Sequence, residues 1–128
     1  IRFSLLHAWR EAPAVDYAAF PATYHCNILR KGYGQGYYTE LVLAFLDRLD
    51  SLGITGIHGH ITEPAGKGIW QRFEKMFTEE RAQEFDEKPC TMFQIVLGDE
   101  REMVNRAWGA RVQDYRKWIQ WLRETQRI

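Results

Sequence analysis

The chain has 128 residues, with 17 Lys and Arg against 17 Asp and Glu, 45% hydrophobic residues and 14% aromatic residues. This length and hydrophobic fraction are those of one folded globular domain or of part of one, and they exclude a disordered chain. Because the charges balance, there is no basic field for nucleic acid, and we expect no nucleic-acid partner. No apolar run approaches the roughly 20 residues that cross a bilayer, so we expect no membrane partner.

Two cysteines, Cys26 and Cys90, lie far apart and belong to no motif. Neither has a CxxC partner or a His pair at the spacing of metal ligands, so we expect no metal site. So few cysteines favour a reducing compartment, and we expect an intracellular protein of the cytoplasm or the nucleus.

Hydrophobic periodicity predicts the elements of the first half of the chain. Residues 2–10 and 14–20 are typical of short helical pieces. Tyr24, Cys26 and Ile28 alternate with polar residues, which predicts a strand over 23–29. An amphipathic helix then ends at a C-cap glycine, Gly53. Its apolar stripe comprises Leu41, Val42, Phe45, Leu46, Leu49 and Leu52.

The second half of the chain continues this alternation of strands and helices. A strand is predicted over 54–62, a helix over 67–77 and a third strand over 90–97. The charged residues 78–89 favour an exposed helix end or loop. Sequential strands separated by helices predict an α/β (α+β) fold with a right-handed βαβ unit and a parallel strand pair.

Residues 99–128 are predicted to form one long amphipathic helix. Its apolar residues recur at helical spacing and are Val104, Trp108, Val112, Tyr115, Trp118, Ile119 and Leu122. Such a face needs a partner surface, which is either its own domain or a homodimer or interdomain contact through residues 104–122. A membrane surface fits less well because the polar face is mixed in sign.

Three glycines, Gly32, Gly34 and Gly36, lie between the first predicted strand and the following helix. Such a loop lets a ligand approach the backbone closely, and the helix N-terminus offers free amides and a positive dipole end to a phosphate. The loop lacks the Gly-Lys-Ser/Thr ending of a Walker P-loop and the full dinucleotide-binding pattern. By itself it is either a phosphate cradle or a plain turn.

In its context the loop resembles the pyrophosphate loop of the GNAT superfamily of N-acetyltransferases, Arg/Gln-x-x-Gly-x-Gly/Ala. Two registers fit the family pattern: Lys31–Gly36, which keeps a basic first residue, and Tyr33–Tyr38. We prefer the second register because it places the aliphatic pair of the family's helix on Leu41 and Val42.

Other segments resemble the same family in the same order. His25-Cys26-Asn27-Ile28-Leu29 and residues 52–58 are similar to two segments of a subgroup close to the acetyltransferase-like domain of O-GlcNAcases, and residues 73–77 to the end of the last core helix. The resemblance implies a GNAT-like mixed sheet flanked by helices. Residues 1–98 would be the C-terminal portion of such a domain, whose N-terminal part is expected to be missing, and residues 99–128 an added helix.

The resemblance implies an acetyl-CoA-dependent N-acetyltransferase that transfers acetyl to an amine of a small molecule or a protein. The alternative is a non-catalytic GNAT-like module for protein interaction. In the family's arrangement, main-chain groups near Ile28 and Leu29 would meet the pantetheine. The pyrophosphate would be held by the loop residues Tyr33, Gly34, Gln35, Gly36, Tyr37 and Tyr38.

Transfer to an amine needs a general base. The candidates are His25, His58 and His60, which alternate along the predicted strands, and Glu63, which follows the second strand. Asn27 stands where the subgroup has an Asp, and we assign it to the substrate site.

Four positions depart from the family pattern. Tyr33 stands at the Arg/Gln place and Tyr38 at a Gly/Ala place, where its bulk could fill the cradle. Gly66 stands where a cofactor-contacting Asn is common. Phe73 replaces the tyrosine that often protonates the leaving thiolate. These departures favour the interaction module, whereas the loop favours the enzyme.

Overall fold

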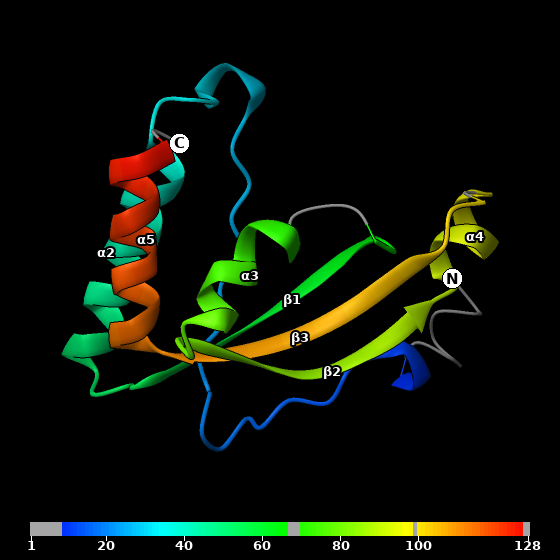
Figure 1. The fold of residues 1–128 in the computed structure, drawn as a ribbon, viewed down its shortest axis with the longest axis horizontal. Coiled ribbons are helices and arrows are strands. Elements are labelled where there is room, and N and C mark those ends of the chain that lie inside the picture. Colours follow the sequence, from blue (N-terminus) through cyan, green and yellow to red (C-terminus); the bar gives the residue numbers. More distant parts are fainter. Residues whose placement is uncertain (1–8, 67–69, 99, 127–128) are drawn as a thin grey trace.

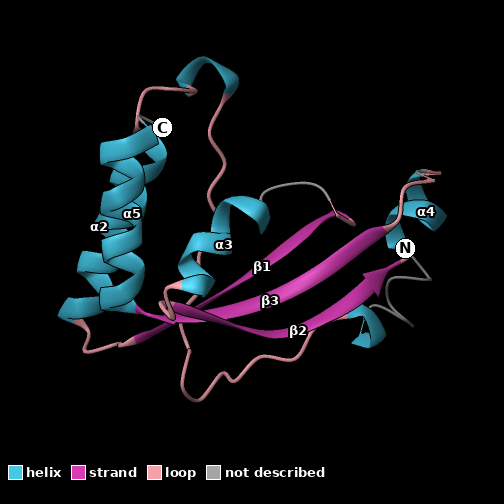
Figure 2. Ribbon diagram, viewed as in Figure 1, coloured by secondary structure: helices cyan, strands magenta, loops and turns pink. Residues whose placement is uncertain are grey.

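The structure is a computed structural model that describes residues 9–66, 70–98 and 100–126. Its centre is a three-stranded antiparallel sheet in the order β1-β3-β2, with α2 and α5 packed together at one end (Figures 1 and 2). The expected mixture of α and β structure is confirmed. In chain order the elements are the 3-10 helix η1 (Arg30–Gly32), α2 (Tyr37–Ser51), β1 (Gly56–Pro64), α3 (Trp70–Thr78), β2 (Ala82–Cys90), α4 (Met92–Leu97), β3 (Met103–Arg111) and α5 (Val112–Gln126).

β3 lies between the other two strands and forms both ladders. β1 runs antiparallel to it with Gly56 opposite Arg111, and β2 runs antiparallel to it with Ala82 opposite Ala110. A bulge interrupts the β2 ladder after Glu84. The bulge and the charged side chains of β2 are devices that keep an edge strand from pairing with another chain.

The predicted helix over residues 99–128 is wrong for its first part. Residues 103–111 form the central strand β3, and the helix begins at Val112. The error has a geometric cause, because Val104, Trp108 and Val112 are spaced by four, an interval that keeps side chains on one face of a strand as well as of a helix. The helical prediction is confirmed over 112–126.

The prediction for residues 78–97 is also wrong. The charged stretch contains β2, and the apolar run predicted as a strand forms the short helix α4. A short apolar run fits a strand and a buried helix equally well, so periodicity does not separate them. The strand over 54–62 and the helix over 67–77 are confirmed as β1 and α3, except that residues 67–69 lie outside the described residues.

α2 is the predicted amphipathic helix, with a narrower buried stripe than the pattern indicated. Val42, Leu46 and Leu49 are buried in the core, whereas Leu41 and Leu52 are 54% and 55% exposed. A single helix face cannot bury the residues at both edges of a wide stripe, so the inner positions alone reach the core.

The C-cap prediction for α2 is confirmed. Gly53 has a φ of 69°, its N–H donates to the carbonyl of Asp50, and the N–H of Ile54 donates to the carbonyl of Leu49. These two bonds form a Schellman motif, in which glycine adopts the left-handed conformation without a steric penalty.

The apolar face of α5 is covered inside the chain. The helix packs along α2 (Figure 1), and Val112, Tyr115, Trp118, Ile119 and Leu122 are at most 3% exposed. Arg116 joins the two helices, with Nη1 and Nη2 each 2.6 Å from a carboxylate oxygen, of Asp47 and Asp50 respectively. A contact with a second chain through residues 104–122 remains a prediction. None of the helices in the described part of the chain is long and apolar enough to cross a bilayer.

Residues 23–29 run beside β1 without joining the sheet. Ala22 forms an isolated parallel bridge with Ile57, and the described segment then diverges from β1. The prediction that residues 23–29 form a strand paired in parallel with a neighbour is therefore wrong, because only the single bridge at Ala22 is present. Residues 23–29 are alternately exposed and partly buried, as the sequence pattern indicated. A strand in a sheet also needs hydrogen bonds to a neighbouring backbone, and a sequence pattern does not show whether that neighbour is present.

The N-terminal segment crosses the sheet on the face opposite the helices. The predicted helical piece at 14–20 is wrong, because the Asp16 side chain and carbonyl accept the N–H groups of Ala19 and Phe20 and hold a turn instead. Residues 9–11 are helical, while the rest of the other predicted piece, 2–8, lies outside the described residues.

Candidate functional site

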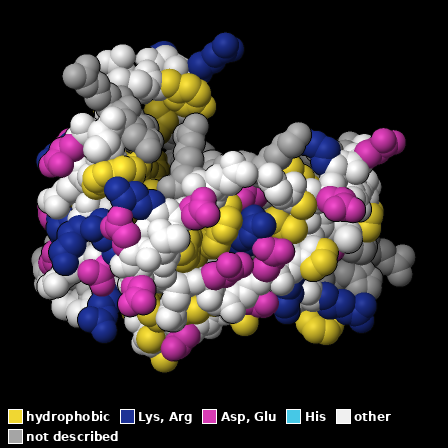
Figure 3. All heavy atoms as spheres, in the orientation of Figure 1, with side chains coloured by type: hydrophobic (Ala, Val, Ile, Leu, Met, Phe, Trp, Pro, Cys, Tyr) yellow, Lys and Arg dark blue, Asp and Glu magenta, His cyan; other side chains and the backbone are white. Residues whose placement is uncertain are grey.

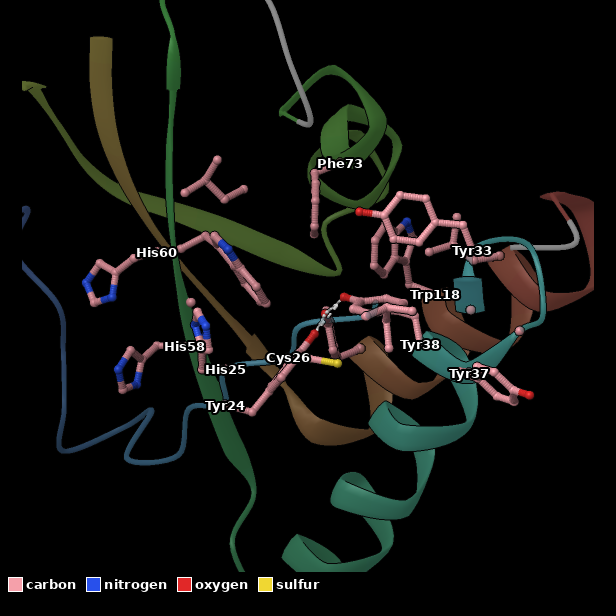
Figure 4. Close-up of a pocket in the computed structure, with 18 of the residues that line it drawn as sticks. Tyr24, His25, Cys26, Tyr33, Tyr37, Tyr38, His58, His60, Phe73 and Trp118 are labelled. Carbon is pink, nitrogen blue, oxygen red and sulfur yellow. Dashed lines mark hydrogen bonds between the residues drawn. The ribbon is translucent and has the colours of Figure 1, made fainter. Parts of the chain in front are cut away.

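A pocket of about 640 Å³ opens where residues 24–28 separate from β1 (Figure 4). Its walls come from segment 24–28, from the glycine loop and helix start at 32–38, from residues 58–61 of β1, and from aromatic side chains of α3, β3 and α5. Pockets of this size and largely apolar lining are typical sites for small molecules and cofactors.

Two glycines shape the β1 wall. A Cβ added at Gly56 would meet the backbone of Ala19 and Phe20, so the N-terminal segment lies directly against this residue. A Cβ added at Gly59 would meet the indole of Trp108, so the indole packs flat against the strand beside the pocket. Glycine at these positions is explained by close approach rather than by an unusual backbone conformation.

The rim of the pocket is the glycine loop and the N-terminus of α2. Gly34 and Gly36 have φ angles of 73° and 76°, which glycine adopts readily. Gly36 is the N-cap of α2, and Oγ1 of Thr39 donates to its carbonyl over 2.8 Å. The N–H groups of the first helical turn have no acceptor within the helix and lie at the positive end of its dipole.

Two cations lie beside this rim. Arg30 and Lys31 belong to η1, are exposed, and form no ion pair within the described part of the chain. Elsewhere on the visible surface acidic and basic side chains are interspersed (Figure 3). The rim therefore combines free amides with unpaired positive charge, a combination that suits a phosphate.

Most of the residues predicted to bind the cofactor line this pocket. They are Ile28, Tyr33, Gly34, Gly36, Tyr37 and Tyr38. Leu29 and Gln35 lie outside it, and Leu29 is 71% exposed. The phenol rings of Tyr33 and Tyr37 are also largely exposed at the rim.

Tyr38 turns away from the helix N-terminus and does not fill the cradle. Its hydroxyl lies 2.7 Å from the hydroxyl of Tyr24, which lies 2.7 Å from the hydroxyl of Tyr115 (Figure 4). The side chain at this Gly/Ala place therefore packs into the inner wall of the pocket, where α2, α5 and segment 24–28 meet.

Burial keeps Tyr24 and Tyr115 of this cluster protonated. Burial raises the pKa of Tyr24 far above its ordinary range, and the neighbouring Tyr38 adds to the rise. Burial also raises the pKa of Tyr115 well above its ordinary value, with Tyr24 and Tyr38 adding to it. At physiological pH these groups are neutral hydroxyls, which donate and accept hydrogen bonds but do not act as bases.

The candidate bases on β1 lie on the other side of the strand. His58 and His60 point away from Tyr38, Phe73 and Trp118 (Figure 4). Strand geometry explains this, because alternate residues face opposite sides of a sheet. The pocket thus has a helix side, lined by aromatic rings, and a histidine side.

The hydrogen bond of His58 defines its tautomer. Nδ1 lies 2.7 Å from the carbonyl oxygen of Phe20, and because a carbonyl only accepts, Nδ1 carries the hydrogen. His60, whose ring lies 5.6 Å from that of His58, has a pKa lowered by burial and by the neighbouring His58. His60 is therefore mostly neutral at pH 7, which is the form that a general base requires.

His25 and Asn27 lie on the wall across from β1. The side-chain amide of Asn27 donates to Nε2 of His25 over 2.9 Å, and both residues are exposed. His25 lines the pocket, whereas Asn27 lies outside it. The structure therefore brings the three predicted histidines to one opening and leaves Asn27 as a neighbour of one of them.

Glu63 does not reach the pocket. It is 6% exposed, its Oε1 lies 2.9 Å from Nη1 of Arg106, and its carboxylate accepts the N–H of Trp70 at the start of α3. The guanidinium and the helix N-terminus together fix the position of the carboxylate. Its position gives it a structural contact instead of access to a ligand.

Three further pocket residues were not predicted from the sequence: Tyr24, Tyr115 and Trp118. Tyr115 and Trp118 are i, i+3 neighbours on α5, a spacing that indicates a packed helix face and carries no sign of a ligand. Trp118 stacks on Phe73 of α3, with ring centroids 4.7 Å apart. The signal that could have found them is the density of aromatic residues in α5.

Comparison with protein-family models, curated proteins and solved structures found no match. Across residues 9–66, 70–98 and 100–126, no group of three or more His, Cys, Asp or Glu side chains could hold a metal ion.

Proposed function

We propose that this chain is an acetyl-CoA-dependent N-acetyltransferase with a GNAT-like fold, which transfers acetyl to an amine. The observation that carries the proposal is the pocket between segment 24–28 and β1, with a glycine loop and a helix N-terminus at its rim. An elongated ligand with a phosphate at one end and a reactive group at the other matches this arrangement of free amides outside and apolar walls inside.

The order of elements also supports the proposal. A separated extended segment, the glycine loop, α2, β1, α3, β2 and β3 follow one another, and β3 inserts between β1 and β2. The resemblance seen in the sequence implies the same succession of cofactor strand, pyrophosphate loop and helix. The divergence after Ala22 leaves the outer edge of β1 without a ladder partner, and its main-chain groups are available to a ligand.

The residues at the rim would hold the phosphates of the cofactor. The N–H groups from Gly36 to Thr39 and the side chains of Arg30 and Lys31 supply hydrogen bonds and charge. The pantetheine arm would lie between segment 24–28 and β1. The cofactor supplies an activated acyl thioester, and the chain's own residues position it and receive the amine.

The histidine side supplies the base. An amine attacks only in its neutral form, so its proton must pass to a nearby acceptor. His60 is exposed and mostly neutral at pH 7, and His58 lies beside it with Nδ1 fixed by Phe20. We assign proton acceptance to His60 and its orientation to the contact with His58.

Calorimetric titration of the full chain with acetyl-CoA tests the proposal. Gly34→Ala should weaken binding about fivefold, because an alanine at this left-handed φ costs about 1 kcal/mol and shifts the loop. Gly98→Ala is the matched control, since Gly98 has a φ of 64°, equally open surroundings and no place in the pocket. No binding at millimolar acetyl-CoA would reject the proposal.

A transfer assay on a panel of amines separates the enzyme from the alternative. Phe73 lacks the hydroxyl that the family often uses to protonate the leaving thiolate, and this favours a non-catalytic module for protein interaction. Acetyl transfer that is lost in His60→Gln supports the enzyme. Acetyl-CoA binding without transfer to any amine supports the module.

A further inference from the structure

The inner wall of the pocket has more hydrogen-bond donors than it can pair. The three hydroxyls of Tyr24, Tyr38 and Tyr115 carry three hydrogens, yet only two short contacts join them, each of 2.7 Å. The third edge, between Tyr38 and Tyr115, is 3.5 Å long and too long for a good O–H···O bond. One hydroxyl hydrogen is therefore left for this weak contact or for a ligand.

Trp118 adds a second, independent donor. Its indole nitrogen Nε1 is buried and has no hydrogen-bond partner in the described part of the chain, and the side chain lines the same pocket. An indole N–H can only donate. A buried donor without an acceptor costs about 1–3 kcal/mol in a folded protein, so an acceptor supplied by a ligand would stabilise it.

We propose that Tyr24, Tyr38, Tyr115 and Trp118 form a donor wall that binds an uncharged or anionic acceptor group of the ligand. The inference deepens the proposed function and rests on it, and it assigns the acyl thioester end of the cofactor to this wall. The wall offers donors in excess and no carboxylate to neutralise an ammonium group, so its chemistry favours an acceptor group.

The charge state of the wall agrees with this assignment. Burial raises the pKa of Tyr24 and of Tyr115 well above the ordinary value for a phenol, so these two hydroxyls stay neutral at physiological pH. A neutral donor stabilises negative charge that develops on a carbonyl oxygen or a sulfur without needing to ionise. Phe73, which has no hydroxyl, lies next to this wall through its stacking on Trp118.

The donor wall also defines how the two substrates enter. The acyl thioester lies toward the helix side of the pocket, and the amine approaches from the histidine side, where His58 and His60 face away from the tyrosines. The two groups then meet at the outer edge of β1, beside residues 58–61, where the pocket opens. This arrangement separates donors for the acyl group from acceptors for the amine proton.

Titration of three conservative variants with acetyl-CoA and with CoA tests the donor wall. Tyr38→Phe removes one donor and keeps the ring, and Trp118→Phe removes one donor and keeps a smaller aromatic ring, so each should weaken acetyl-CoA binding about threefold to tenfold. Trp121→Phe is the control, because it makes the same change as Trp118→Phe on the same helix, and Trp121 packs against Lys75 outside the pocket. It should bind within about twofold of the parent chain.

The ratio of the two affinities separates the wall from a general loss of packing. CoA lacks the acyl carbonyl, so loss of a wall donor should weaken acetyl-CoA more than CoA, whereas a packing defect weakens both alike. If the parent chain binds acetyl-CoA and both wall variants bind it as tightly, or lose both ligands equally, the donor wall is overturned. If the parent chain binds neither ligand, the proposed function itself fails.

Discussion

The backbone N–H of His58 donates a 2.8 Å hydrogen bond to the carbonyl oxygen of Ala22, and beyond this pair the two described segments separate. The N–H of Ala22 donates in turn to the carbonyl of Gly56 over 3.3 Å. These two bonds hold the chain against β1 at one end of the wedge-shaped space between segment 24–28 and β1, which forms the pocket. The pocket therefore depends on a short backbone contact rather than on a complete parallel ladder.

Gly56→Ala should disrupt this closed end. The added Cβ would meet the backbone of Ala19 and Phe20, which cannot move aside as a flexible side chain would. We expect a loss of about 2–3 kcal/mol in the free energy of unfolding, measured by urea denaturation. Gly66→Ala, with φ strain but no neighbour within 4 Å, should cost only about 1 kcal/mol. Equal costs for the two variants would contradict the close contact at Gly56.

Two leucines of α2 test the width of its buried face. Leu46 is 0% exposed, so Leu46→Ala should lower the free energy of unfolding by about 2–5 kcal/mol through lost burial and a cavity. Leu41 is 54% exposed, and Leu41→Ala should change the free energy of unfolding by at most about 0.5 kcal/mol. Thermal or urea unfolding of both variants measures this, and a large effect at Leu41 would show that α2 is rotated from the orientation described.

The Glu63–Arg106 pair tests the structural assignment of Glu63. Its side chains are 7% and 12% exposed, so Arg106→Ala leaves a nearly buried carboxylate without its guanidinium and should cost about 2–4 kcal/mol of stability. Lys88→Ala removes a longer, more exposed pair with Asp86 and should cost less than about 1 kcal/mol. If Glu63→Gln abolished acetyl transfer while leaving stability unchanged, Glu63 would be a base after all.

His60 should contribute to the pH dependence of stability. Burial and the neighbouring His58 lower the pKa of His60, so the unfolded chain binds its proton more readily than the folded chain. Its contribution is fully present above the unfolded pKa of about 6.5 and is lost as the pH falls below that value. Urea unfolding at several pH values should therefore show a smaller acid loss of stability in His60→Gln, and identical slopes would contradict the lowered pKa.

Glu11 acts at lower pH through the same linkage. Burial alone would raise its pKa, but hydrogen bonds from the side chain and N–H of Thr91 and from the N–H of Met92 together lower it. Its stabilisation is present above the unfolded pKa and is lost as the pH falls through the lower folded value. Glu11→Gln should unfold with a weaker dependence on pH below about pH 5. An unchanged dependence would argue against these hydrogen bonds.

Periodicity was sufficient to predict the elements that have one clear period. α2, β1 and α3 are such elements, and Gly53 was recognisable as a cap because only a left-handed residue ends a helix with that pair of bonds. It failed for β3, whose apolar residues are spaced by four, and for β2, whose charged residues lie on an exposed edge. In both cases strand pairing with distant residues, which no local pattern records, decided the structure.

The candidate site was predictable where local geometry creates it. Gly34 and Gly36 were identified because a glycine loop before a helix N-terminus can hold a phosphate, and the structure places both in the pocket. The tyrosine cluster was not predictable, because Tyr24 and Tyr115 are joined only by the packing of α5 against segment 24–28. Glu63 was chosen for its position after a strand, and the sequence contained no sign of its contact with Arg106.

The measurement that tests the central claim most directly is a titration of isotope-labelled full chain with acetyl-CoA, followed through amide chemical shifts. The account predicts that the largest changes fall on amides around the wedge, at Ile28, Gly34, Gly36, Tyr38 and Gly59. It would be contradicted by unchanged spectra at millimolar acetyl-CoA, or by changes centred on β2 at the far edge of the sheet.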